Sequence, residues 1–361
     1  MVVVFKPSLK CNIKCKHCYV GDERSNYENM SLQDAVTVLS KIPAGSEVIF
    51  HGGEPMLMGL DFYRHLVAKF ESKFRFSMQS NLMLAHAGWA NFIKDDLNGR
   101  ISTSFDVVGT MRPVSKVGWM EKLLLLKEYD ISPYVVSVLS KENQDHALQM
   151  YRFFSSLGSS FRINYVENIG YAGLNGLNSL RHDTMKYAQA LIDVFDVWFM
   201  NPDANILVDP CAEILSFFLL GSSAKKCPFT SSCAQHLISV NPDGSVFPCG
   251  GFDTFHSFRY GNLITQSLDE VLSSSVRFAA CERLLYLPEK CQSCYYFPIC
   301  EGGCRLEAYS YYGDMHRETS MCEEYRMLFS HIERKIDEEK GDMLDWWQSL
   351  LNHNELVSKD N

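Results

Sequence analysis

Residues 11–19 read CNIKCKHCY and place Cys11, Cys15 and Cys18 within eight positions, directly after a short apolar run, Val2 to Phe5, that predicts a strand. Thiols grouped this closely are typical of metal ligands. A structural zinc site is closed by four ligands, whereas a four-iron cluster held by only three cysteines keeps one iron open to an outside ligand. The stretch therefore predicts a metal centre to which a further molecule binds.

The composition is that of an ordinary globular protein, because 361 residues with 46% hydrophobic side chains bury one large core or two modest ones. A formal charge of −9 and a pI near 5.7 argue against nucleic acid as a partner, since phosphate binding needs a clustered basic face. No stretch approaches a secretion signal or a membrane span. We expect a cytoplasmic protein with no membrane partner.

Thirteen cysteines in such a protein are not a disulfide framework, because the cytoplasm keeps thiols reduced. Their distribution is uneven: three lie at 11–18 and ten lie between 211 and 322. The sequence therefore predicts two metal-binding regions that flank a body without cysteine.

That body alternates strands with helices. Helices are predicted after Ser31, whose side chain starts a capping box, after Asn143, which caps a segment running through Phe154, and over Leu180 to Met200. The predicted strands are Val2 to Phe5, Glu47 to His51, Phe74 to Ser80, Ile101 to Phe105, Tyr134 to Val138 and Phe161 to Tyr165. Such alternation predicts an α/β fold in which a parallel sheet of six units closes part of a TIM barrel, with its ligands at the carboxyl ends of the strands.

The composition of the sequence changes near residue 205. We expect a partial-barrel domain over 1–204, a metal-built domain rich in cysteine, proline and glycine over 205–325, and a helical tail over 326–361. The tail carries an apolar stripe that predicts a helix docked on the body. The stripe consists of Met343, Leu344, Trp346, Trp347, Leu350 and Leu351.

A second motif follows the second predicted strand, where the chain reads His51-Gly52-Gly53-Glu54-Pro55. Two glycines permit close approach of the backbone to a ligand. The carboxylate of Glu54 is a candidate for holding a cationic amino group.

Together, Cys11-X3-Cys15-X2-Cys18-Tyr19 and Gly52-Gly53-Glu54-Pro55 resemble the radical S-adenosylmethionine superfamily. The resemblance implies a partial six-unit barrel whose [4Fe-4S] cluster binds S-adenosylmethionine, which is cleaved on reduction to a 5′-deoxyadenosyl radical. By position in the family pattern, Gly52, Gly53 and Glu54 contact the amino group, and Tyr19 lies near the adenine.

The resemblance offers two further cofactor contacts, Asn81 and Ser104, each at the end of a predicted strand. Hydrogen bonding that merely closes the strand ends is an equal alternative for both. Ser104-Phe105-Asp106-Val107 stands where the family often has Ser-Leu-Asp-Gly. Arg112 comes earlier than the arginine that the family often places after this motif, so the roles of Asp106 and Arg112 stay open.

The later cysteines resemble the SPASM domain of peptide- and protein-modifying members of the superfamily. The resemblance implies two auxiliary [4Fe-4S] clusters and so three clusters in all. Cys227, Cys233, Cys249 and Cys304 would hold one, and Cys291, Cys294, Cys300 and Cys322 the other. Two zinc ribbons would use the same kind of ligand. Cys211 and Cys281 are left over, and we expect both to be buried.

The resemblance implies an oxidoreductase that modifies a ribosomally made precursor peptide, for example by a carbon–carbon or thioether crosslink, with the auxiliary clusters accepting the electron that leaves the substrate. An electron donor such as flavodoxin or ferredoxin is expected. Since Cys11 leaves no room for an amino-terminal leader-binding domain, the body or a separate partner protein would bind the leader.

Two other classes of function remain. One is an enzyme that acts on a folded protein or a small molecule, including sulfatase maturation. Sulfatase maturases commonly place an aspartate directly after the cysteine that corresponds to Cys249, whereas Gly250 and Gly251 follow here, and Asp253 is interpreted as a turn acid. The other is a binding module held together by zinc.

Overall fold

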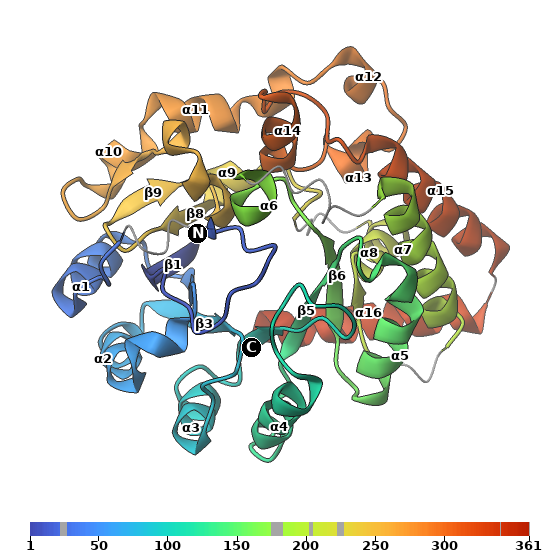
Figure 1. Cartoon of the computed structure of the whole chain (residues 1–361). Coiled ribbons are helices and arrows are strands. Elements are labelled where there is room, and N and C mark those ends of the chain that lie inside the picture. Colours follow the sequence, from blue (N-terminus) through green and yellow to red (C-terminus); the bar gives the residue numbers. More distant parts are fainter. Residues whose placement is uncertain (22–26, 175–182, 202–204, 222–226, 340, 361) are drawn as a thin grey trace.

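The computed structural model describes residues 1–21, 27–174, 183–201, 205–221, 227–339 and 341–360, with side chains up to residue 352 in the last helix. The described strands form one curved sheet in the order β10-β9-β8-β1-β2-β3-β4-β5-β6-β7 (Figure 1). The strands are β1 (Val2–Ser8), β2 (Ser46–Gly52), β3 (Phe74–Ser80), β4 (Ile101–Ser104), β5 (Tyr134–Leu139), β6 (Phe161–Tyr165), β7 (Val208–Asp209), β8 (Leu237–Val240), β9 (Ser245–Phe247) and β10 (Gly261–Asn262).

All six predicted strands are confirmed, and they pair in parallel from β1 to β6. The parallel sheet extends beyond the prediction at both edges, because β7 pairs with β6 and β8 pairs with β1. These two short strands lie in the region where cysteine, proline and glycine dominate, so their apolar pattern was too brief to be read from the sequence. The carboxyl ends of the strands share one rim, as a parallel sheet requires.

The crossover helices cover the outside of the curved sheet (Figure 1). The helices of this part are α1 (Leu32–Lys41), α2 (Leu60–Phe70), α3 (Ala87–Asp95), α4 (Lys116–Lys127), α5 (Ala147–Ser156), α6 (Gly170–Leu174) and α7 (Thr184–Phe199). Aromatic rings fill the space between sheet and helices: Phe50 stacks on Phe76 with ring centroids 5.2 Å apart, and the ring of Tyr63 of α2 lies 4.6 Å from that of Phe50. This packing makes the body a rigid support for the loops at the rim.

Two predicted helix starts had different outcomes. Ser31 caps α1 as expected, because its hydroxyl accepts a hydrogen bond from the backbone nitrogen of Asp34. A helical segment begins directly after Asn143 as predicted, but the side chain of Asn143 does not cap it: this side chain accepts from the nitrogen of Ser140 and donates to the carbonyl oxygen of Val138, and so closes a turn after β5. The long predicted helix is α7, and residues 180–182 of that prediction lie outside the described ranges.

After residue 205 the chain adds mostly short helices and two long ones, and the long helix over 322–338 lies beside α7 (Figure 1). They are α8 (Cys211–Leu220), α9 (Cys233–His236), α10 (Leu268–Leu272), α11 (Ser275–Cys281), α12 (Glu289–Gln292), α13 (Phe297–Cys300), α14 (Arg305–Tyr312), α15 (Cys322–Glu338) and α16 (Asp342–Asp360). None of the helices in the described ranges is long and apolar enough to cross a membrane.

The predicted docking of the apolar stripe is confirmed. Trp347 of α16 is fully buried, its ring lies 4.2 Å from that of Trp198 and stacks on Phe199 at 5.8 Å, and its indole nitrogen donates to the carbonyl oxygen of Phe199 at 3.0 Å. Trp347 therefore fixes α16 to α7.

The loops that carry the later cysteines are held by a buried arginine rather than by a large apolar core. Arg283 is fully buried, and its guanidinium donates to the carbonyl oxygens of Met315, Gly302, Gly303 and Arg317 at 2.6–2.9 Å. One planar group with five donors thus ties together backbone segments that lie up to 34 residues from it in the sequence.

Candidate active site

A cavity of about 590 Å³ opens at the carboxyl ends of the strands. Cys11, Cys15 and Cys18 lie on its wall together with Gly52 and Gly53. Other parts of its wall come from the end of β6 and from the region after residue 205, including Glu167, Cys227 and Tyr325. The cavity therefore joins the first group of cysteines to one cysteine of the second region.

The two glycines let the end of β2 lie directly against the cysteine loop. Gly52 has a φ of 129°, and a Cβ atom there would come within 2.0 Å of the carbonyl oxygen of Ser8. A Cβ on Gly53 would lie 2.3 Å from the carbonyl oxygens of Leu9 and Lys10. No other residue fits at either position without moving the backbone that leads into Cys11.

The contact of Glu54 with an amino group stays a prediction, and the structure shows which protein groups its carboxylate binds. Its side chain is fully buried and is not part of the cavity wall. One carboxylate oxygen accepts hydrogen bonds from the nitrogen of Met56 at 3.0 Å and the hydroxyl of Ser80 at 2.8 Å, and the other accepts from the nitrogen of Asn81 at 2.8 Å. Glu54 thus ties the end of β2 to the end of β3, and the backbone of the two glycines is what faces the cavity.

Asn81, Ser104 and Tyr19 all line the cavity, as expected for residues near a bound cofactor. The amide of Asn81 donates to Asn12 at 2.8 Å and lies 3.8 Å from the sulfur of Cys11, whereas the hydroxyl of Ser104 accepts from Gln79 at 2.9 Å. The Tyr19 hydroxyl is 3.3 Å from Nδ1 of His51. Each side chain therefore makes a structural hydrogen bond and also presents a surface to the cavity.

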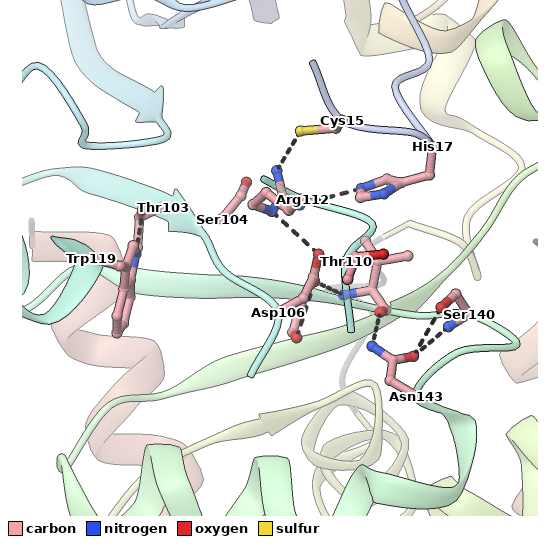
Figure 2. Close-up of polar contacts among 12 residues, drawn as sticks. Cys15, His17, Thr103, Ser104, Asp106, Thr110, Arg112, Trp119, Ser140 and Asn143 are labelled. Carbon is pink, nitrogen blue, oxygen red and sulfur yellow. Dashed lines mark hydrogen bonds and ion pairs between the residues drawn. The ribbon is translucent and has the colours of Figure 1, made fainter. Parts of the chain in front are cut away.

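Sequence reasoning gave His17 no role and left the roles of Arg112 and Asp106 open. Figure 2 shows that Arg112 contacts Cys15, His17 and Asp106. The guanidinium of Arg112 lies 3.6 Å from the sulfur of Cys15, 3.3 Å from Nε2 of His17 and 3.3 Å from a carboxylate oxygen of Asp106. Burial first, and then the charge of Arg112, lower the pKa of His17 to about 4. His17 is therefore neutral, and because arginine only donates, Nε2 of His17 accepts and Nδ1 carries the proton.

The two predicted groups of later cysteines are each close together. Cys291, Cys294, Cys300 and Cys322 line a separate cavity of about 70 Å³. In the other group, a hydrogen bond from Cys227 lowers the pKa of Cys304 to about 7. Burial first, and then the charges of Cys304 and Cys233, raise the pKa of Cys249. The guanidinium of Arg283 lies close enough to both groups to interact electrostatically with Cys304, Cys233 and Cys300.

The donors fit iron–sulfur clusters, because each of the three groups consists of thiols alone and thiolates are the usual ligands of such clusters. Within the described ranges, no three histidine, cysteine, aspartate or glutamate side chains converge on the position of a single metal ion. Of the two remaining cysteines, Cys211 is buried as expected. Cys281 is only half-buried, because it ends the short helix α11 at the edge of an apolar cluster.

Asp253 is not a turn acid, and that interpretation is wrong. Its side chain is buried and forms an ion pair with the fully buried Lys6 of β1, which also donates to the carbonyl oxygen of Gly250 at 3.0 Å and lies 4.9 Å from the ring centroid of Tyr19. Each charge offsets part of the cost of burying the other. Asp253 does not line the large cavity.

Glu167, just beyond β6, is a site residue that sequence reasoning missed. It supplies the single carboxylate on the wall of the large cavity among the residues that the structure describes. Burial, followed by the negative charges of Cys304 and Glu307, raises its pKa to about 8. Its place after a predicted strand, on the rim where ligands bind, was the signal that could have identified it.

Comparison with known proteins agrees with this geometry. The Radical SAM superfamily matches residues 5–154, and SPASM, an iron-sulfur cluster-binding domain, matches residues 227–295. The cysteine-type anaerobic sulfatase-maturating enzyme of Clostridium novyi (strain NT) is 25% identical over 360 residues, covering 91% of this chain and 94% of that protein.

Solved structures share the fold. The structure described as native anSMEcpe with bound AdoMet and Cp18Cys peptide has a TM-score of 0.80 at 22% identity, covering 93% of this chain and 98% of its own. Streptococcus suis SuiB bound to precursor peptide SuiA has a TM-score of 0.66 at 17% identity, covering 89% and 75%. With a radical SAM domain that includes Cys11, Cys15 and Cys18 and a cluster-binding domain over residues 227–295, the chain belongs to the radical SAM enzymes that carry a C-terminal SPASM domain.

Proposed function

We propose that this enzyme oxidatively modifies a residue of a peptide, with a crosslink in a ribosomally made precursor peptide as the leading product. The observation that carries the proposal is the single cavity whose wall includes Cys11, Cys15 and Cys18 on one side and Cys227 and Glu167 on the other. A substrate side chain in this cavity would lie between the two cysteine regions. The peptide ligands named for anSMEcpe and SuiB support a peptide substrate.

Cys11, Cys15 and Cys18 would hold a [4Fe-4S] cluster with S-adenosylmethionine, which supplies a 5′-deoxyadenosyl radical that removes a hydrogen atom. Clusters at the later cysteines would supply an acceptor for the electron that must then leave. The backbone of Gly52 and Gly53 would bind the cofactor, with Asn81, Ser104 and Tyr19 beside it. Glu167 would take up the proton released when the new bond forms, because it is the carboxylate in the cavity wall and Asp253 is already paired with Lys6.

Sulfatase maturation is the second candidate, favoured by the name of the Clostridium novyi relative. Against it stands Gly250, which occupies the position where sulfatase maturases commonly carry an aspartate. A Cβ on Gly250 would lie 3.3 Å from the Lys6 ammonium and 3.6 Å from the Tyr19 hydroxyl, so a carboxylate there would compete with Asp253.

The test uses anaerobically reconstituted enzyme with S-adenosylmethionine, a chemical reductant and one of two probes. The probes are a short peptide encoded beside the gene and a cysteine-containing peptide copied from a sulfatase. We expect the first probe to lose two hydrogen atoms by mass spectrometry, with 5′-deoxyadenosine formed alongside, and Glu167→Gln to cleave the cofactor without making this product. Conversion of only the sulfatase peptide would replace the leading proposal by the second.

A further inference from the structure

The contact between Arg112 and Cys15 has no part in the proposed function. Arg112 lies in the loop after β4, and its side chain is only 10% exposed. It donates toward the sulfur of Cys15 at 3.6 Å and toward His17 at 3.3 Å (Figure 2). A guanidinium keeps its positive charge at every physiological pH, so Cys15 lies beside a permanent charge that is shielded from water.

Asp106 holds this charge in place. One carboxylate oxygen accepts from the backbone nitrogen of Val138 at 2.8 Å and is 3.4 Å from the hydroxyl of Ser137, and the other lies 3.3 Å from Nε of Arg112. The Asp106 side chain is only 2% exposed. The negatively charged Asp106 therefore fixes the positively charged guanidinium relative to β5.

The loop of Arg112 is also joined directly to the loop of the first cysteines. The backbone nitrogen of Lys16 donates to the carbonyl oxygen of Met111 at 2.8 Å, and the Lys16 ammonium donates to the hydroxyl of Thr110 at 2.7 Å. The residue that follows Cys15 is thus bonded to the two residues that precede Arg112. These bonds keep the sulfur and the guanidinium at short range.

We propose that Arg112, positioned by Asp106, sets the reduction potential of the cluster held by Cys11, Cys15 and Cys18. Hydrogen bonds to the sulfurs and the net charge nearby are the means by which a protein tunes such a cluster. Reduction adds a negative charge, so a buried positive charge beside Cys15 favours the reduced state and raises the potential. The negative charge of Asp106 offsets part of this effect.

The inference rests on the cluster of the proposed function. It predicts that substitutions of Arg112 and Asp106 shift the reduction potential of this cluster in opposite directions. The potential is measured by electrochemical titration of the EPR signal in protein without S-adenosylmethionine. The signal of this cluster is identified in the wild-type protein as the one that changes when the cofactor is added. We expect Arg112→Gln to shift the potential to a more negative value, Arg112→Lys to stay near wild type, and Asp106→Asn to shift it to a more positive value.

Lys14→Gln is the matched control, because it removes the same charge one residue from Cys15 but from an exposed side chain. We expect its potential to equal that of the wild type. Iron content and the unfolding transition are measured on every variant, so that loss of the cluster is not read as a change in potential.

Three results would overturn the inference. The first is an Arg112→Gln potential equal to that of Lys14→Gln, and the second is a shift of the same sign for Arg112→Gln and Asp106→Asn. The third is an unchanged potential together with weaker cofactor binding by Arg112→Gln, which would assign the guanidinium to S-adenosylmethionine itself. A wild-type protein that binds iron at the later cysteines but gives no cofactor-sensitive signal would contradict the proposed function instead.

Discussion

At the scale of single residues, Glu54 shows that a motif can identify a loop without fixing the direction of each side chain in it. The two glycines before it lie against the cysteine loop as the motif implies, and the cavity wall includes both. The carboxylate instead accepts three hydrogen bonds inside the protein. Sequence spacing identifies the loop but not the direction in which a side chain points, because that direction depends on donors from the next strand.

Glu54→Gln tests this placement. The amide keeps one acceptor but faces the remaining donors with an NH2 group, so a buried donor loses its partner at a cost of about 1–3 kcal/mol in the free energy of unfolding. We expect that loss in urea denaturation, together with weaker S-adenosylmethionine binding and unchanged iron content. Glu71→Gln on the surface is the control and should match wild type. Weaker cofactor binding without any loss of stability would show that the carboxylate holds the cofactor.

Glu167 makes stability depend on pH. Its pKa is 4.5 as a model compound and about 8 in the folded protein. A raised pKa in the folded state means that the neutral form is favoured there, so this contribution to stability is complete below pH 4.5 and is lost as the pH rises through about 8.

We therefore expect the free energy of unfolding of the wild type to fall, relative to that of Glu167→Gln, as the pH is raised over this range. Urea denaturation at a series of pH values measures the difference, and Glu121→Gln on the surface of α4 should follow the wild type. A difference between wild type and Glu167→Gln that does not change with pH would contradict the raised pKa.

At the scale of elements, the strands were predictable and the caps and edges were not. The six predicted strands are short segments rich in apolar or β-branched residues, and each is present at the expected place. β7 and β8 have two and four residues and owe their pairing to neighbours that are distant in the sequence. Asn143 carries a good capping side chain, but the turn after β5 offers it closer partners.

The docking of α16 is an element-scale feature with a sharp test. Trp347→Ala removes a fully buried ring from between α16 and α7 and should lower the free energy of unfolding by about 3–5 kcal/mol. Trp346→Ala, which removes the same side chain from a half-buried position next to it, should cost less. Equal effects of the two substitutions in urea denaturation would show that the specific packing against Trp198 and Phe199 is not what holds the helix.

At the scale of the whole molecule, the region after residue 205 is continuous with the barrel, because β8 pairs in parallel with β1. The buried ion pair of Lys6 and Asp253 crosses the same boundary, next to the ring of Tyr19. The sequence separates the two regions by composition, whereas the structure joins them through one sheet. Backbone pairing between distant segments leaves no local signal, so this union could not be predicted from the residues alone.

Although one sheet joins the two regions, the cysteine groups lie in separate places. We therefore expect that substituting the cysteines of one group removes its cluster and leaves the other clusters in place. Wild-type protein reconstituted under anaerobic conditions should hold about twelve irons, at four for each of three clusters. Replacing Cys11, Cys15 and Cys18 together with alanine should leave about eight irons and abolish cleavage of S-adenosylmethionine by a chemical reductant. Iron analysis and 5′-deoxyadenosine formation measure the two effects.

Cys294→Ala is the converse variant, because Cys294 lines the cavity of about 70 Å³ and not the large one. It should retain reductive cleavage of the cofactor, since the first cysteine group is untouched, and lose the oxidised peptide product, since the route for the departing electron is damaged. The cysteines also support the fold of their region, so only soluble protein with a normal unfolding transition is compared. If such protein still makes the full product, the cluster at Cys291, Cys294, Cys300 and Cys322 is structural, and the electron must leave through the group that contains Cys227, which lies on the wall of the substrate cavity itself.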